Sequence, residues 1–167
     1  LLTNAGNSTR ENLGVYMQDA LADIGIAVVF QAIDFGTLLE RMDAQTFDMY
    51  IIGWTGLGTD PADYAFFDSN QDIVGSGFNN TSYQNARVEE LLVEGYSVPG
   101  CAPADRAPIY KEIQQIIHEE LPYIFLGGRV ANAFYNKDWQ NVDPGSWNFN
   151  WNIHNWYKQS LQPSVAP

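Results

Sequence analysis

The sequence has 167 residues, which fits one domain of ordinary size. Hydrophobic residues make up 46% of it, enough to build a buried core. Twenty acidic residues against eight basic ones give a formal net charge of -12. This balance argues against a nucleic acid partner and against docking on an anionic membrane surface, because both require clustered Lys and Arg. The single cysteine, Cys101, excludes an intramolecular disulfide and a cysteine-based structural zinc site.

The first half of the sequence alternates between strand and helix patterns. The predicted elements are a strand over 1–4, a helix from Ser8 to about residue 24, a strand over 26–33, a helix after Asp34 and a strand over 47–53. Ser8 and Glu11 have the spacing of a capping box, and Gly25 is a favoured left-handed helix stop. The β-α-β-α-β order implies parallel strands with right-handed crossovers, and therefore an α/β fold.

The second half contains two helix patterns. Asn85 can cap the first of them, and the second runs from about residue 104 to Leu121, where Pro122 ends it. Residues 68–83 have the composition of a long polar loop, and residues 123–126 that of a strand. The tail from residue 136 to the end differs in kind, because it holds four of the five tryptophans among many asparagines.

The sequence offers no catalytic or cofactor motif of high specificity. His118 is best explained as a surface or capping histidine near the end of a helix, and His154 has no nucleophile beside it in sequence. Gly56-Leu57-Gly58 lacks the third glycine of a dinucleotide fingerprint. The sequence Asp68-Ser69-Asn70-Gln71-Asp72 starts like a calcium loop but lacks its glycine and its closing glutamate. We therefore expect no cofactor and no metal. A secreted hydrolase that uses paired carboxylates stays open as an alternative, as does a structural extracellular domain.

One loop remains as a candidate binding site, the segment from Trp54 to Asp60. It follows a predicted parallel strand, and ligands of open α/β sheets bind at the carboxyl ends of the strands. The loop offers an aromatic face, small residues and an acid. Trp54 is as well explained as a cap on the core, and Asp60 is better explained as a helix cap.

Several segments in order resemble family 5 of the extracellular solute-binding proteins, the peptide-, nickel- and oligosaccharide-type receptors of ABC importers. The segments are Leu2-Thr3-Asn4 with Arg10, Asp23-Ile24-Gly25-Ile26, Phe47-Asp48 with Gly53-Trp54 and Asp60-Pro61, Tyr83-Gln84-Asn85, Val88-Glu89-Glu90-Leu91-Leu92, Asp105-Arg106, Tyr110-Lys111-Glu112-Ile113-Gln114 and Ile116-Ile117-His118-Glu119-Glu120-Leu121-Pro122-Tyr123-Ile124. No single motif decides the resemblance, which lies in their order and spacing. It covers the chain from Leu1 to about Tyr135.

The resemblance implies a fragment, the C-terminal lobe of a two-lobed receptor with a periplasmic-binding-protein-like (type II) fold. Residues 1–135 would be this lobe, and residues 136–167 a tail that returns toward the N-terminal lobe. The implied function is capture of a peptide- or oligosaccharide-like solute by lobe closure and delivery to an ABC permease, without catalysis. The implied location is periplasmic or extracellular, with a lipoprotein anchor as one form.

The resemblance also implies site residues. We expect Trp54 to stack on the solute, Leu57 to shape the pocket, and Asn79 and Tyr83 to donate hydrogen bonds. Peptide-binding members have an aspartate at the position of Leu57, where it pairs with the α-amine of the peptide. An apolar residue cannot neutralise an ammonium group, so a free-amine peptide is in doubt. Residues 42–86 contain no Lys or Arg, so an anionic solute would need a positive partner from the other lobe.

Overall fold

A computed structural model describes residues 1–54, 65–128, 132–145 and 148–158. By their contacts the residues form two compact units. The first comprises Leu1–Thr55 and Asp60–Tyr123, and the second comprises Gly56–Thr59 and Ile124–Pro167. The change from one unit to the other after Tyr123 precedes the boundary expected after residue 135. The assignment of these parts to a lobe and a returning tail stays a prediction.

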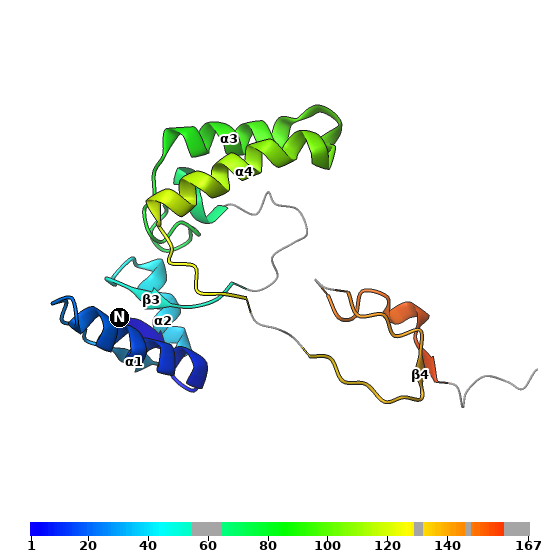
Figure 1. Ribbon diagram of the computed structural model, residues 1–167, viewed down its shortest axis with the longest axis horizontal. Coiled ribbons are helices and arrows are strands. Elements are labelled where there is room, and N and C mark those ends of the chain that lie inside the picture. The colour runs from blue at the N-terminus through cyan, green and yellow to red at the C-terminus, as the bar shows by residue number, and fades with distance from the viewer. Residues whose placement is uncertain (55–64, 129–131, 146–147, 159–167) are drawn as a thin grey trace, which may run out of the picture. The chain divides into compact units, whose positions relative to one another are not determined.

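Within the residues that the structure describes, the first unit contains a small sheet and four helices (Figure 1). In chain order its elements are β1 (Leu2–Asn4), α1 (Ser8–Ala22), β2 (Gln31–Ile33), α2 (Phe35–Asp43), β3 (Tyr50–Ile51), α3 (Ala86–Ser97) and α4 (Pro103–Glu120). Short 3-10 turns occur at Ala65–Phe67, Ser69–Gln71 and Pro99–Cys101. Among the residues described, no helix has the length and apolar character needed to cross a membrane.

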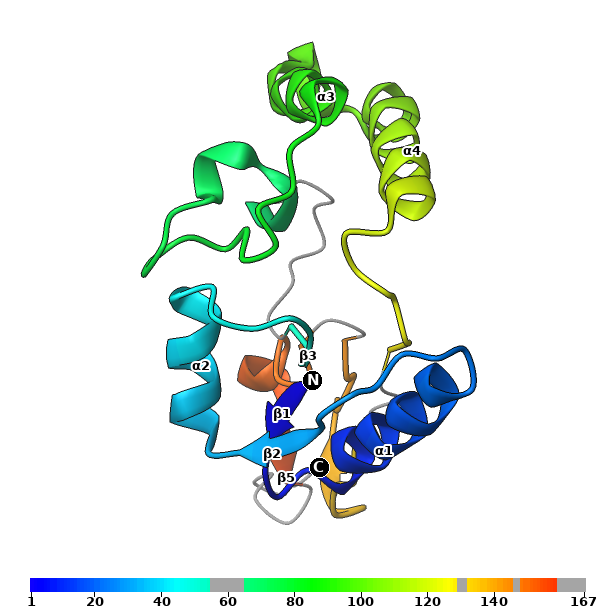
Figure 2. The ribbon, with the colours of Figure 1, turned by 90° about the vertical axis from the view of Figure 1, so that its left-hand side faces the viewer.

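The sheet has the strand order β2-β1-β3, and both pairings are parallel. Leu2 of β1 lies opposite Gln31 of β2 and Tyr50 of β3. Because β1 is central, the two crossovers run in opposite directions, and right-handed connections then place α1 and α2 on opposite faces of the sheet. Figure 2 shows this arrangement, with the strands between the two helices. The predicted parallel sheet flanked by helices is confirmed.

The helix starts follow from side-chain caps. Asp34 accepts hydrogen bonds from the amides of Gly36 and Thr37, and Asn85 caps α3 in the same way, as predicted. The cap of α1 is Asn7 rather than Ser8, because the Asn7 side chain accepts from the Arg10 amide at 3.1 Å. The predicted capping residue is therefore wrong by one position, although the helix does begin where the pattern placed it.

The strands are shorter than predicted. Only residues 31–33 of the segment 26–33 and residues 50–51 of the segment 47–53 are strand. The central strand β1 is three residues long, so it offers few backbone N–H and C=O groups with which the flanking segments can pair. The predicted strand over 123–126 is also wrong, since within the described chain these residues join neither sheet.

The first unit buries two apolar clusters. The helical cluster joins α3 and α4 with one aromatic residue of the preceding turn; its buried members are Phe67, Val88, Leu91, Leu92, Ile109, Tyr110, Ile113 and Ile117. Figure 1 shows the two helices side by side. The sheet cluster is smaller and contains Leu2, Leu38 and Met42 as its buried members.

The second unit contains the aromatic tail. Strands β4 (Trp139–Gln140) and β5 (Tyr157–Lys158) pair antiparallel, and a 3-10 turn spans Ile153–Asn155. The asparagines close the loop between the strands, since buried Asn152 donates to the Asn141 carbonyl oxygen at 3.0 Å and accepts from the Trp156 indole at 2.6 Å. Polar side-chain bonds therefore shape this unit as much as apolar packing does.

Candidate ligand-binding site

Trp54 follows β3 and lies in an aromatic cluster, which we define as Trp54, Phe66 and Phe78. The Trp54 ring stacks on Phe66 with centroids 4.3 Å apart and meets Phe78 edge-on at 6.1 Å. Phe78 is 50% exposed, so one side of the cluster is open to solvent. The cluster therefore presents an apolar, aromatic surface next to the carboxyl end of a parallel strand, where α/β sheets bind ligands.

The other side of the aromatic cluster is anchored in the helical cluster. Phe66 meets the buried Phe67 edge-on at 6.3 Å. Phe67 in turn lies against Tyr83 at 6.0 Å and Tyr123 at 5.1 Å. Such edge-to-face pairs hold the rings in fixed orientations. The open face is thus carried on a packed support and not on an isolated loop.

Asn79 is fully buried and organises the loop that carries Phe78. Its amide nitrogen donates to the carbonyl oxygens of Asp68 at 3.2 Å and Tyr83 at 2.8 Å. Its amide oxygen accepts from the Tyr83 backbone at 3.0 Å. The side chain is therefore engaged within the loop, as buried amides require. Its role as a hydrogen-bond donor to a solute stays a prediction.

Tyr83 is half-buried and connects the loop to the end of α4. Its hydroxyl donates to the Glu120 carboxylate at 2.5 Å, and Asn85 donates to the other oxygen of this carboxylate at 2.8 Å. The Tyr83 hydrogen bond, with help from Asn85, holds the pKa of Glu120 below its usual range. Burial and then the Glu120 carboxylate raise the pKa of Tyr83. Its predicted contact with a solute is likewise untested.

Leu57 and Asp60 lie outside the described residues. Of the four predicted site residues, the structure therefore places Trp54, Asn79 and Tyr83, all in the first unit. Asn79 and Tyr83 adjoin each other, and Tyr83 connects to Trp54 through Phe67 and Phe66.

Sequence reasoning missed three aromatic residues near Trp54. Phe66 and Phe78 complete the aromatic cluster. Phe78 is a bulky ring in the polar loop of residues 68–83, which is a sequence signal, whereas Phe66 belongs to the turn before this loop. Tyr123, after α4, lies against Tyr50 and Trp54, and no sequence signal places it there. Burial raises the pKa of Tyr123, the Tyr50 hydroxyl raises it further, and Trp54 partly offsets this. Burial also raises the pKa of Tyr50.

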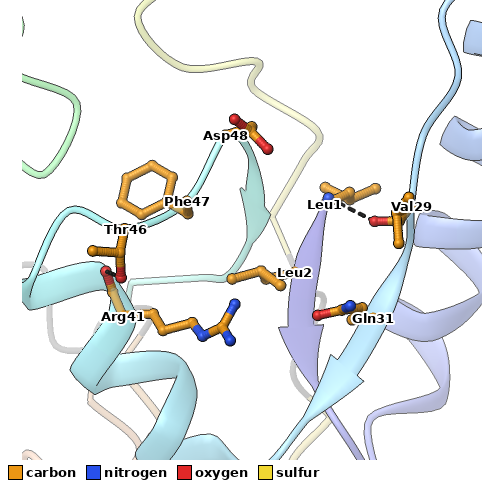
Figure 3. Close-up of a pocket in the computed structure, with 8 residues that line it drawn as sticks. All are labelled: Leu1, Leu2, Val29, Gln31, Arg41, Thr46, Phe47 and Asp48. Carbon is orange, nitrogen blue, oxygen red and sulfur yellow. Dashed lines mark hydrogen bonds between the residues drawn. The ribbon is translucent and has the colours of Figure 1, made fainter.

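A cavity of about 210 Å³ lies at the opposite edge of the sheet (Figure 3). It is lined by Leu1, Leu2, Val29, Gln31, Arg41, Thr46, Phe47 and Asp48. β1 and β2 begin at Leu2 and Gln31, and Asp48 precedes β3, so the cavity lies at the amino ends of the strands. Ligands of parallel sheets bind at the carboxyl ends, so this cavity is not our candidate site.

The acidic loop residues considered for calcium have other partners. Asp68 accepts from the Asn70 amide at 2.8 Å, and Asp72 accepts from Gln45 at 2.8 Å and from Ser82 at 3.0 Å. In the part of the chain that the structure describes, no group of three His, Cys, Asp or Glu residues is placed to hold a metal ion. These carboxylates stabilise the loop.

Comparison with known proteins supplies a family. Residues 1–73 match the profile of the bacterial extracellular solute-binding proteins, family 5 Middle. The oligopeptide-binding protein AppA of Bacillus subtilis (strain 168) is 37% identical over 131 residues, covering 75% of this chain and 23% of AppA. The chain thus spans about a quarter of the length of the curated relatives that it matches.

Solved structures agree with the family 5 match. AppA of Bacillus subtilis in complex with a nonapeptide has a TM-score of 0.74 and 29% identity, over 94% of this chain and 31% of AppA. NikZ of Campylobacter jejuni in complex with Ni(L-His) has a TM-score of 0.70 and 26% identity, over 94% of this chain and 32% of NikZ. The α/β fold class of periplasmic binding proteins is confirmed.

Proposed function

We propose that this chain is a solute-binding segment of an extracytoplasmic receptor that serves an ABC importer, and that its solute is a peptide. The observation that carries the proposal is the aromatic cluster beside the carboxyl end of β3, in a chain whose first 73 residues are a family 5 segment. Relatives named for oligopeptides and di/tripeptides support a peptide over an oligosaccharide. The family consists of solute-binding proteins, and we propose no catalysis.

In this proposal the chain contributes one lobe and the remainder of the receptor contributes the other. Closure of two lobes around a solute removes the aromatic cluster from water and gives affinity that neither lobe has alone. Trp54 stacks on a side chain of the peptide, and Leu57 shapes the pocket beside it. Asn79 and Tyr83 contribute by holding the loop that presents Phe78, and a direct hydrogen bond from either residue is part of the same proposal.

The location and the partner follow from the role. A receptor of this kind works outside the cytoplasmic membrane, in the periplasm or at the cell surface, where a lipoprotein anchor can hold it. Its partner is the permease that accepts the solute. The net charge of -12 is compatible with such a soluble receptor.

The test is calorimetric titration of the full-length protein with a peptide selected from a random nonapeptide pool by retention and mass spectrometry. We expect Trp54→Ala to weaken binding about tenfold or more, because buried aromatic side chains dominate such interfaces. Trp54→Phe keeps a ring and should lose less. Tyr16→Ala is the matched control, since this aromatic residue is 71% exposed on α1.

Two results would contradict the proposal. If the full-length protein retained no peptide from the pool, the solute class would be wrong. If Trp54→Ala bound as tightly as the Tyr16→Ala control, the aromatic cluster would not be the binding surface.

A further inference from the structure

A positive charge lies at the edge of the sheet next to the aromatic cluster. Arg10 belongs to the first turn of α1, and its Nη1 donates to the Asn4 side-chain oxygen at 2.6 Å. Asn4 is the last residue of β1. The bond therefore fixes the guanidinium at the carboxyl end of the central strand.

Gly53 shows where the rest of the guanidinium lies. A Cβ atom at Gly53 would come within 3.3 Å of Arg10 Nη2, which is tighter than ordinary contact. Gly53 directly precedes Trp54, and it follows β3 after one intervening residue. The guanidinium thus reaches from the end of β1 to the end of β3, at the edge where the aromatic cluster begins.

No acid neutralises this charge among the described residues. The neighbouring Glu11 carboxylate accepts instead from the Gly6 amide at 2.7 Å. The ion pairs in the described part of the chain are those of Arg87 with Glu90 and Glu112. Nη1 is the one guanidinium nitrogen of Arg10 with an acceptor within those same residues, and Nε and Nη2 remain as donors.

We propose that Arg10 binds a carboxylate of the solute through Nε and Nη2. These two nitrogens present parallel N–H groups that match the two oxygens of a carboxylate. The inference rests on the proposed function and narrows its substrate class, to a peptide that presents a carboxylate to this lobe. The carboxylate is that of the peptide's C-terminus or of an acidic side chain.

The inference revises one expectation from the sequence. The absence of Lys and Arg over residues 42–86 suggested that an anionic solute must find its positive partner in the other lobe. The partner comes instead from the first turn of α1. It is distant in sequence from the Trp54 loop but shares an edge with it, because β1 and β3 are parallel neighbours.

The test uses three pools of random heptapeptides with the full-length protein. One pool has a free C-terminal carboxylate and no acidic residues, the second is the same pool amidated, and the third is amidated with one Glu per peptide. We expect the first or the third pool to bind at least tenfold tighter than the second, as a charge-assisted pair requires. Which of them does so identifies the source of the carboxylate.

Variants assign this preference to Arg10. Arg10→Gln should abolish the difference between the carboxylate pools and the amidated pool, and Arg10→Lys should retain part of it. Arg87→Gln is the control, because this arginine is exposed and paired on the surface of α3. Thermal melts establish whether each variant is folded. If Arg10→Gln does not fold, the carboxylate preference of Arg10→Lys is compared with that of the wild-type protein instead.

Each outcome has one meaning. Equal binding of all three pools by the wild-type protein, or an undiminished carboxylate preference in folded Arg10→Gln, would overturn the role of Arg10 and leave peptide binding intact. Binding of none of the pools would overturn the proposed function and this inference with it.

Discussion

The first unit has a sheet half, residues 1–54 with β1–β3, α1 and α2, and a helical half, residues 65–123 with α3 and α4. The two halves differ in how completely they bury their apolar residues. On α4, Ile113 is 0% exposed within a cluster of eight buried residues. On α1, Gly14 is the buried residue, while Val15 is 48% exposed and Tyr16 is 71% exposed. α3 and α4 are adjacent in sequence and cover each other, whereas α1 has a three-stranded sheet on one side. A helix pattern thus predicts a helix but not what covers it.

Polar bonds join the two halves. The Gly75 amide donates to the Asp43 carbonyl oxygen at 2.7 Å, and Asn80 donates to the Met42 carbonyl oxygen at 3.2 Å. Gln45 adds a bond to Asp72. These contacts tie the loop that carries Phe78 to the end of α2. The aromatic cluster therefore lies where a tightly packed half meets a loosely packed one, a common location for a ligand site.

The largest loss of stability should come from truncating a buried side chain of the helical cluster. We expect Ile113→Ala to lower the free energy of unfolding by about 4 kcal/mol, because the rigid neighbours of this residue cannot collapse into the cavity. Urea denaturation of the full-length protein measures the loss. Val93→Ala, on the exposed side of α3, should change stability by less than about 0.5 kcal/mol.

Leu38→Ala makes the matching change in the sheet half, where Leu38 is also 0% exposed. We expect a smaller loss, about 3 kcal/mol, because the half-buried neighbours of Leu38 can relax. An equal or larger loss than for Ile113→Ala would show that the sheet half is as rigid as the helical half.

Alanine substitutions at two glycines test the same difference in packing, with smaller expected changes in the free energy of unfolding. A Cβ at Gly95 would lie 2.7 Å from the Tyr110 hydroxyl, and Tyr110 is buried between the helices. We expect Gly95→Ala to lower the unfolding free energy by about 1–2 kcal/mol, in spite of the better helix propensity of alanine. Denaturant midpoints measure the difference.

Gly14→Ala is the counterpart in α1. Its Cβ would overlap the Phe30 ring, but Phe30 is half-buried and can turn aside. We expect a change within about 0.5 kcal/mol, since the propensity gain offsets the displacement. A cost equal to that of Gly95→Ala would contradict the looser packing of this half.

The sequence predicts correctly those features that depend on residues close together in the chain, namely the helix caps and helix ends. The caps Asp34 and Asn85, the left-handed Gly25 and the end of α4 at Leu121 all follow from short-range rules, and all are confirmed. Strand lengths were overestimated because they depend on partners distant in sequence. The same limit applies to the site. The strand before Trp54 points to that residue, but Phe66 and Phe78 meet it, and Arg10 approaches the preceding Gly53, only through the fold.

Hydrogen exchange of the full-length protein with and without bound peptide tests the account most directly. Peptide binding should protect fragments that contain Trp54 or Phe78, which lie at the carboxyl edge of the sheet. Fragments that contain Thr46 and Asp48 and end before Gly53 line the cavity at the amino edge and should exchange unchanged. Protection confined to the amino-edge fragments, with none at Trp54 or Phe78, would contradict it.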